Sequence, residues 1–298
     1  MAITASQVKE LRQATGVGMM ECKKALVESE GDLDKAILWL REKGMAKAAK
    51  KAGRTAAEGI VEFLISSSKR EAAIIELNCE TDFAGKNSDF QAFAKKLASH
   101  ALENKISDIK SLTSLEISGQ SIATQLAELI TKVGENMSVR RVRYLHVDQG
   151  LITGYSHMGG KIGTLVCLSG EGEDLDRLGA DLAMHVAASA PKYLDRSQVA
   201  PTELEQEKEI ARKRLKEQGK PDDIIEKALM GQVNKFYTDV CLVDQPFVKE
   251  PKLSVNKYAK QFGAKVTPSE FVRFQLGEGI DVKQENFADE VEIGRAHV

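Results

Sequence analysis

Apolar positions repeat at helical spacing through residues 1–44 and predict three short helices. Thr4 and Gln7 fit a capping box, in which each side chain satisfies a backbone donor of the first turn. Asp32 is suited to cap the third helix, and Gly44 is suited to end it. A bundle of this size has only a marginal core, so we expect a small module tethered to a larger body.

Residues 45–58 begin with an Ala/Lys-rich stretch that lacks a broad apolar face. A basic stretch is either a nucleic-acid-binding patch or a solvated helical linker. This one is short and has no aromatic residues between its lysines, which favours the linker.

Strand-length apolar runs then occur twice in the same order, as a hairpin, a helix and a late Val-Arg-aromatic strand. The hairpins span 60–65 with 72–77 and 152–157 with 162–168, and the late strands contain 142–144 and 272–274. This order predicts an α+β fold with a duplicated core of small antiparallel sheets and helices. The first unit is expected at 59–148, and the second at 149–194 and 238–280.

His100 and His185 occupy matching positions in the two predicted helices of these units. Matched positions in a repeat favour a packing role over metal ligation. We therefore predict no metal site.

Residues 195–237 interrupt the second unit with two charged helices joined by a Gly- and Pro-containing turn. This pattern predicts an inserted coiled-coil hairpin, which serves more often as a docking or dimer surface than as a catalytic one. A homodimer or a 2:2 complex with a partner is one expectation. A last helical module is predicted at 281–298.

A short polar turn at residues 78–83 follows the second strand and presents an acid, Asp82, beside an aromatic, Phe83. The aromatic is either core packed under the turn or an outward anchor for a partner, and local geometry alone favours core.

Composition narrows the classes of function. The chain has 298 residues, is 42% hydrophobic and 29% charged, and has a net charge of -2, so no general attraction to nucleic acid or membrane is expected. Four scattered cysteines without a Cys-x-x-Cys pair argue against a zinc site or a disulfide framework. The N-terminus lacks the pattern of a signal peptide, and no apolar run has membrane-spanning length. A cytoplasmic location is the simplest expectation.

The sequence contains no phosphate-binding loop, dinucleotide fingerprint, metalloprotease motif or nucleophile elbow. Cys79 with His100 is the one nucleophile and base pair to weigh, although a cysteine at a strand end is usually a small hydrophobic residue. The chain is therefore predicted to be a binding protein that is not an enzyme and needs no cofactor.

Several segments resemble the translation elongation factor Ts family, in order and over nearly the whole chain. Residues 11–26 resemble its N-terminal signature and residues 80–83 its second signature. Further similar segments are 134–141, 184–188 and 245–248.

This resemblance implies a nucleotide-exchange factor that binds elongation factor Tu in its GDP-bound and nucleotide-free forms. It assigns the disturbance of the partner's Mg²⁺ site to Thr81, Asp82, Phe83 and Ala84, although the family more often has Val at position 84. Candidate further contacts with the partner are Arg12, Met19, Met20 and His157. Met19 and Met20 are either a soft contact surface or bundle core.

Two rival hypotheses come from other classes of protein. Three helices with a Gly-Val-Gly loop are similar to ubiquitin-associated (UBA) domains, which predicts an adaptor that binds through residues 1–44 without exchange activity. A thiol enzyme would instead use Cys79, and it requires a depressed thiol pKa.

Overall fold

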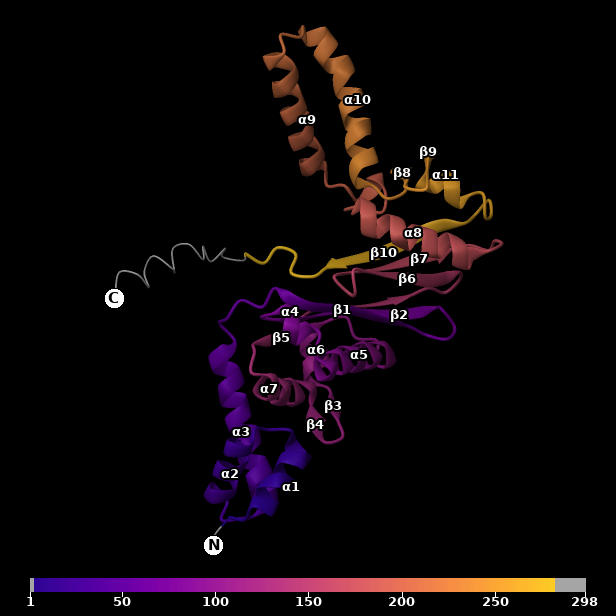
Figure 1. Cartoon of the computed structure of the whole chain (residues 1–298). Coiled ribbons are helices and arrows are strands. Elements are labelled where there is room, and N and C mark those ends of the chain that lie inside the picture. The colour runs from indigo at the N-terminus through magenta and orange to yellow at the C-terminus, as the bar shows by residue number, and fades with distance from the viewer. Residues whose placement is uncertain (1–2, 282–298) are drawn as a thin grey trace.

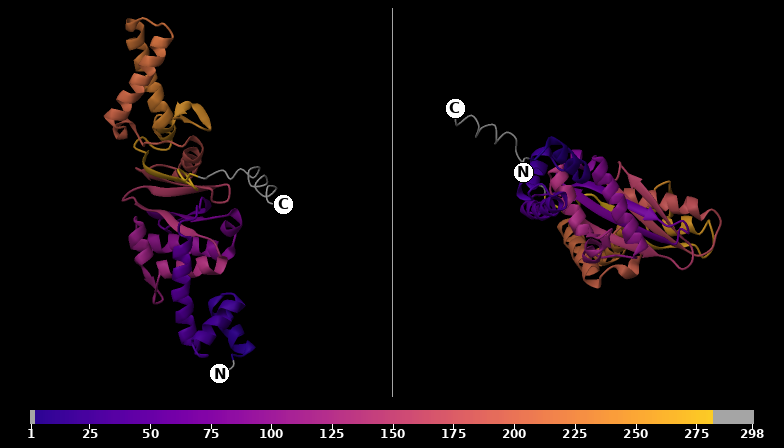
Figure 2. Two further views of the ribbon diagram at one scale, coloured as in Figure 1. Left: turned by 90° about the vertical axis from the view of Figure 1, so that its left-hand side faces the viewer. Right: turned by 90° about the horizontal axis from the view of Figure 1, so that it is seen from below.

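The computed structural model describes residues 3–281 of the chain. Figure 1 shows a helical bundle at one end, a layered core in the middle and a helical hairpin at the other end. The side view in Figure 2 shows the same succession. Helices combine with small antiparallel sheets, so the predicted α+β class is confirmed.

The N-terminal bundle contains α1 (Ala5–Thr15), α2 (Met19–Glu28) and α3 (Leu33–Lys51). The predicted capping box is present, because Thr4 accepts from the backbone of Gln7 and Gln7 accepts from the backbone of Thr4. Asp32 caps α3 by accepting from the Lys35 amide at 3.0 Å. The buried centre of the bundle is apolar, with Leu11 and Leu26 among its fully buried side chains.

The prediction that Gly44 ends the third helix is wrong, because α3 continues to Lys51. At Gly44 the helix lies against α7 (Ile122–Val133), where an added Cβ would be 3.0 Å from Thr131 Oγ1. Glycine is thus used here for close packing between helices rather than for a stop. The first part of the predicted linker is the helix that joins the bundle to the core.

The first layer of the core is a sheet in the order β1-β2-β5. Its strands are β1 (Glu58–Ile65), β2 (Glu71–Cys79) and β5 (Met137–His146). One face of this sheet packs on helices, with Ile75, Leu77 and Phe90 in the shared core. The elements on that side are α4 (Asp82–Gly85), α5 (Ser88–Glu103), α6 (Ile109–Ser114), β3 (Glu116–Ile117), β4 (Gln120–Ser121) and α7.

The second sheet has the order β10-β7-β6, so its hairpin and late strand are arranged as in the first sheet. Its strands are β6 (Leu151–His157), β7 (Ile162–Ser169) and β10 (Thr267–Gln275). Its outer face is covered by α8 (Leu175–Ser189), β8 (Pro246–Phe247), β9 (Glu250–Ser254) and α11 (Val255–Ala259). Both predicted hairpins and both late strands are confirmed.

The two sheets face each other, and glycines of the second sheet allow them to approach closely (Figure 1). A Cβ added at Gly163 would be 2.5 Å from Val61 Cγ1, and one added at Gly154 would be 2.5 Å from the Phe63 ring. Side chains of β1 therefore contact the backbone of the β6–β7 hairpin directly. No larger residue fits these positions without a shift in the packing.

The inserted hairpin consists of α9 (Pro201–Glu217) and α10 (Asp222–Val240). The short helix η1 (Arg196–Gln198) lies near the base of this hairpin. Its Arg196 pairs with Asp244 at 2.9 Å and lies over the Tyr237 ring. Toward the tip the helices share a small apolar cluster that includes Leu215 and Leu229.

The histidines differ in their surroundings. His185 is fully buried in α8, where its Nε2 lies 2.9 Å from Gln245 Oε1 and the Val248 amide donates to its Nδ1 at 3.2 Å. His100 is half-buried and lies 3.3 Å from Glu103. Among residues 3–281, no group of three or more metal-ligating side chains could hold a metal ion. The last helical module, predicted at 281–298, lies outside the described residues apart from residue 281.

The glycine contact between the sheets yields a stability prediction. We expect Gly163→Ala to lower the free energy of unfolding by about 1–3 kcal/mol, because the methyl group overlaps Val61. The matched control is Gly231→Ala in α10. Apart from the nearby backbone of that helix, no atom lies within 4 Å of the methyl group that this substitution adds. That variant should gain about 0.5–1 kcal/mol from helix propensity. Urea denaturation measures both, and equal effects would contradict the role of Gly163.

The buried His185 yields a pH prediction. Burial lowers the pKa of His185, with the hydrogen bond to Gln245 opposing the shift. The unfolded chain therefore binds this proton more readily, so stability is complete above about pH 6.5 and falls as the pH drops below it. We expect the urea midpoint to decrease as the pH is lowered from 8 to 5.5. His185 contributes a slope of at most about 1.4 kcal/mol per pH unit to the free energy of unfolding.

His185→Gln should be less stable at pH 8 and should lack this pH dependence. The exposed His146 provides the control, since His146→Gln should retain it. A parent-like slope in His185→Gln would assign the effect to another group.

Candidate partner-binding site

The turn after β2 presents Phe83 to solvent. Thr81 caps the single-turn helix α4 by accepting from the Ala84 amide at 3.3 Å, and Ala84 is buried against the core. Phe83, which directly precedes Ala84 in the turn, is 80% exposed. The hypothesis that Phe83 is core is therefore wrong, and the structure has the outward arrangement of an anchor.

Close packing beneath α4 holds the inner side of this turn against the core. Gly85 rests on β1, where an added Cβ would be 3.3 Å from the Gly59 carbonyl oxygen. Lys86 Nζ lies 2.6 Å from Asp82 Oδ2 and 5.9 Å from the centre of the Phe83 ring. The hydrogen bond from Lys86 lowers the pKa of Asp82, and the charge of Lys161 adds to this effect. Asp82 is thus an ionised acid beside an exposed aromatic ring.

Cys79 is buried beneath the same turn, and its Sγ donates to the Thr81 carbonyl oxygen at 3.1 Å. Burial, with the negative charges of Glu135 and Glu58, raises the pKa of Cys79 to about 12. A catalytic thiol needs the opposite shift. His100 pairs instead with Glu103, so the contacts do not support the Cys79–His100 pair.

A carboxylate on the neighbouring loop holds Thr81 in place. Glu135 accepts from the Thr81 amide at 2.9 Å and from the Thr81 hydroxyl at 2.6 Å. Glu135 is not among the site residues that the sequence predicts. Its one signal was its place in the segment 134–141, which resembles the family.

The β6–β7 turn lies on the same side of the core. The Val61 amide donates to the Gly160 carbonyl oxygen at 2.8 Å, which holds this turn against the start of β1. Lys161 Nζ lies 3.6 Å from Glu58, and its charge also acts on Asp82. His157 is exposed here, with its Nδ1 3.1 Å from the Tyr155 hydroxyl. The structure therefore brings the His157 turn near the Asp82–Phe83 turn.

Arg12, Met19 and Met20 are exposed on the N-terminal bundle. Met19 is 55% and Met20 77% exposed, so the bundle-core alternative for this pair is wrong. The loop between α1 and α2 touches the core, because an added Cβ at Gly16 would be 3.0 Å from Lys132 Cε. Lys132 in turn pairs at 2.7 Å with Asp89, in the first turn of α5. These contacts connect the loop that precedes Met19 and Met20, the first residues of α2, to the helix that follows α4.

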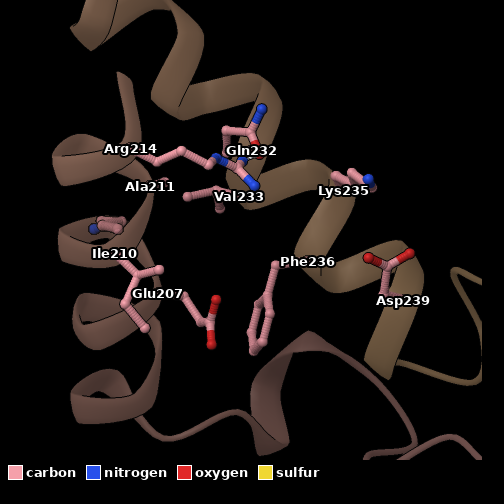
Figure 3. A pocket seen from close by; sticks show the side chains of 10 residues that line it. Glu207, Ile210, Ala211, Arg214, Gln232, Val233, Lys235, Phe236 and Asp239 are labelled. Atoms are coloured by element: carbon pink, nitrogen blue, oxygen red, sulfur yellow. Dashed lines mark hydrogen bonds between the residues drawn. The ribbon is translucent and has the colours of Figure 1, made fainter. Parts of the chain in front are cut away.

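A separate cavity of about 170 Å³ lies between α9 and α10. Figure 3 shows Glu207 and Phe236 extending into the space between the two helices. The cavity separates the apolar cluster at the hairpin tip from the one at its base. None of the predicted site residues lines it.

No helix among residues 3–281 has the length and apolar character needed to cross a membrane.

Comparison with known proteins identifies the family. The model of the family "Elongation factor TS" matches residues 80–278. The elongation factor Ts of Magnetococcus marinus is 46% identical over 299 residues, covering 98% of each chain. That of Trichlorobacter lovleyi is 45% identical over 98% of each chain, and that of Clostridium botulinum (strain ATCC 19397) is 47% identical over 97% of each chain. The chain belongs to the elongation factor Ts family.

Proposed function

We propose that this chain binds elongation factor Tu in its GDP-bound and nucleotide-free forms, disturbs the Mg²⁺ site of the partner and thereby promotes GDP release so that GTP can bind. Membership of the family gives the general role, which is nucleotide exchange in translation elongation. The observation that carries the mechanism is the exposed Phe83 beside the ionised Asp82, on a turn held from below by buried residues.

The chemistry of the bound nucleotide explains why these side chains suit the task. GDP is held largely through its phosphates and a Mg²⁺ ion, which demands near-octahedral geometry. A shift of about 1 Å in one supporting element is enough to spoil such a site. Phe83 can bury its ring in the partner and hold a displaced element there. Asp82 can offer a negative charge to the groups that support the metal.

The magnitudes show that these two residues act with others. Burial of one aromatic side chain supplies about 2–3 kcal/mol. A thousandfold loss of affinity for the nucleotide requires about 4 kcal/mol of coupling free energy. We infer that the N-terminal bundle, through Arg12, Met19 and Met20, grips the nucleotide-binding domain together with the first core unit. The second unit, through the His157 turn, would hold another domain of the partner as a fixed point.

Linkage makes this coupling reciprocal. If the factor lowers the affinity of the partner for the nucleotide by a given ratio, the nucleotide lowers the affinity of the partner for the factor by the same ratio. Binding of GTP therefore ejects the factor, so the chain is not consumed. It changes no covalent bond itself, which is why we class it as not an enzyme.

The finer organisation belongs to the same proposal. Residues 1–44 form a UBA-like module, 45–58 a connection, 59–148 the first core unit, and 149–194 with 238–280 the second. Residues 195–237 form a coiled-coil insertion that contacts the partner or a second copy, as a homodimer or a 2:2 complex. The chain acts in the cytoplasm, where elongation takes place, without direct contact to nucleic acid or membrane.

The adaptor hypothesis shares the exposed Met19 and Met20 with this proposal. It differs at the core, because an adaptor that binds through residues 1–44 has no use for Phe83. Full partner binding and no exchange activity in the parent chain would favour the adaptor. The same full-length chain, tested with elongation factor Tu, distinguishes the two.

Substitutions in the turn test the mechanism. We expect Phe83→Ala to slow the release of fluorescent GDP from elongation factor Tu by roughly thirty- to hundredfold, through loss of its apolar burial. Asp82→Ala should slow it by about tenfold, as one charge-assisted contact is lost. Stopped-flow fluorescence measures both rates.

Ile109→Ala is the control for these variants, since Ile109 is an exposed apolar residue beside β5 and β10, on the opposite edge of the sheets. Its release rate should match the parent. Unchanged release in both Phe83→Ala and Asp82→Ala would move the mechanism away from this turn.

Cys79 provides a second test, directed at the thiol-enzyme hypothesis. We expect Cys79→Ala to release GDP within about threefold of the parent rate, because a protonated buried thiol is no nucleophile. The same variant should lose about 1 kcal/mol of stability from reduced packing. Abolished exchange in a chain that remains folded by circular dichroism would restore a chemical role for the thiol.

A further inference from the structure

The turn that carries Phe83 and the loop after α7 are joined by hydrogen bonds, and each segment supplies one carboxylate that accepts from the other. Glu135, on the loop, accepts from both the amide and the hydroxyl of Thr81. Glu80, on the turn, accepts from the Asn136 amide at 2.5 Å. Two consecutive residues on each side therefore face each other, and each side supplies one carboxylate to a backbone donor of the other.

The end of α3 joins the same junction. Lys51 Nζ donates to the Gly134 carbonyl oxygen, and Asn136 Nδ2 donates to the Arg54 carbonyl oxygen at 2.7 Å. The Arg54 guanidinium lies 3.5 Å from Glu80. Since α3 is one continuous helix from the N-terminal bundle, the loop 134–136 is where the bundle, α7 and the Phe83 turn meet.

We propose that Glu135 is a positioning residue for nucleotide exchange, which sets the direction of Asp82 and Phe83 relative to the N-terminal bundle by clamping Thr81. This inference rests on the proposed function and names a residue through which that function operates. Glu135 acts through Thr81 and needs no contact with the partner.

The chemistry of the clamp requires a carboxylate. Its two oxygens each accept one of the two Thr81 donors, at 2.9 and 2.6 Å. A glutamine at this position has one accepting oxygen, and its NH₂ group would face a donor. Glu135→Gln therefore breaks the paired arrangement while the size of the side chain is kept.

The location of the clamp separates orientation from stability. Both hydrogen bonds are open to solvent, so water replaces them at little cost when they break. Ala84 and Gly85 are buried against the core and do not depend on these two hydrogen bonds for that packing. The loss of Glu135 should thus widen the range of directions of the Phe83 side chain and leave the fold intact.

The experiment compares Glu135→Gln with the control Glu116→Gln, which changes an exposed glutamate on β3. GDP release from elongation factor Tu is measured over a range of factor concentrations. We expect Glu135→Gln to lower the maximal release rate by about tenfold, the effect of one lost charge-assisted interaction, with its half-saturating concentration within about threefold. Glu116→Gln should match the parent in both.

A combined variant tests whether Glu135 acts through Asp82 and Phe83. In the background of Asp82→Ala with Phe83→Ala, Glu135→Gln should cause less than about a twofold further loss, because both side chains that it positions are absent. Full additivity of the two losses would overturn the proposal. So would a parent-like release rate in Glu135→Gln when the parent is active.

A readout without the partner keeps the proposal testable if exchange itself fails. Trp39 is the sole tryptophan, so Trp39→Phe with Phe83→Trp gives a single reporter on the turn. Adding Glu135→Gln should speed the local decay of indole anisotropy while the urea midpoint stays the same. Unchanged anisotropy would overturn the positioning role. An inactive parent chain with faster anisotropy decay in the variant would instead overturn the exchange function alone.

Discussion

The close contact between the two sheets is the constraint on which the arrangement of the site depends. Gly154 and Gly163 leave room for Phe63 and Val61, so β1 lies directly against the backbone of the β6–β7 hairpin. Gly160, at the turn of that hairpin, is equally close to Ile60. Protein interiors are packed too densely to absorb extra methyl groups freely, so this contact has one preferred geometry. The geometry places the His157 turn beside the start of β1, where α4 also packs. Two turns from different sheets thus form one side of the molecule.

A buried ion cluster fixes the same two sheets from another direction. Glu76 on β2 is fully buried, and its carboxylate lies 3.2 Å from Arg140 and 2.5 Å from Arg141. It also accepts from the Gly277 amide at 2.9 Å, just beyond β10 of the second sheet. A buried carboxylate is costly unless its charge is paired and its oxygens are hydrogen-bonded, and here both conditions hold. Arg140 and Arg141 lie on β5, in the same sheet as Glu76, so both ion pairs are internal to that sheet. Sliding one sheet over the other would break the Gly277 hydrogen bond and the one from Arg141 to the Gln275 carbonyl oxygen, so the core acts as a rigid support for the turns.

The parts of this fold that followed from the sequence are those governed by local chemistry. The capping box at Thr4 and the cap at Asp32 depend on a few neighbouring residues, and both hairpins follow from strand-length apolar runs with polar turns. Gly44 failed as a helix end because its partner, Thr131, lies far away in the chain. Phe83 was ambiguous for a similar reason, since the side of α4 that packs inward depends on Gly59 and the core. Glu135 was missed because it acts on Thr81, 54 positions away.

Exposure of the anchor separates the energetics of folding from those of binding. Phe83 and Met20 bury little surface in the free chain, so they contribute little to its stability and leave most of their apolar surface available for the proposed contact with a partner. Such side chains can displace part of a partner only if the turn that carries them is rigid. Thr81, held by Glu135, and Ala84, held by the core, supply that support from two sides. A flexible turn would spend the same burial energy on its own ordering, because fixing a mobile residue costs about 1–2 kcal/mol of entropy. In the proposed mechanism, rigidity beneath Phe83 is therefore what makes its burial available for displacing an element of the partner.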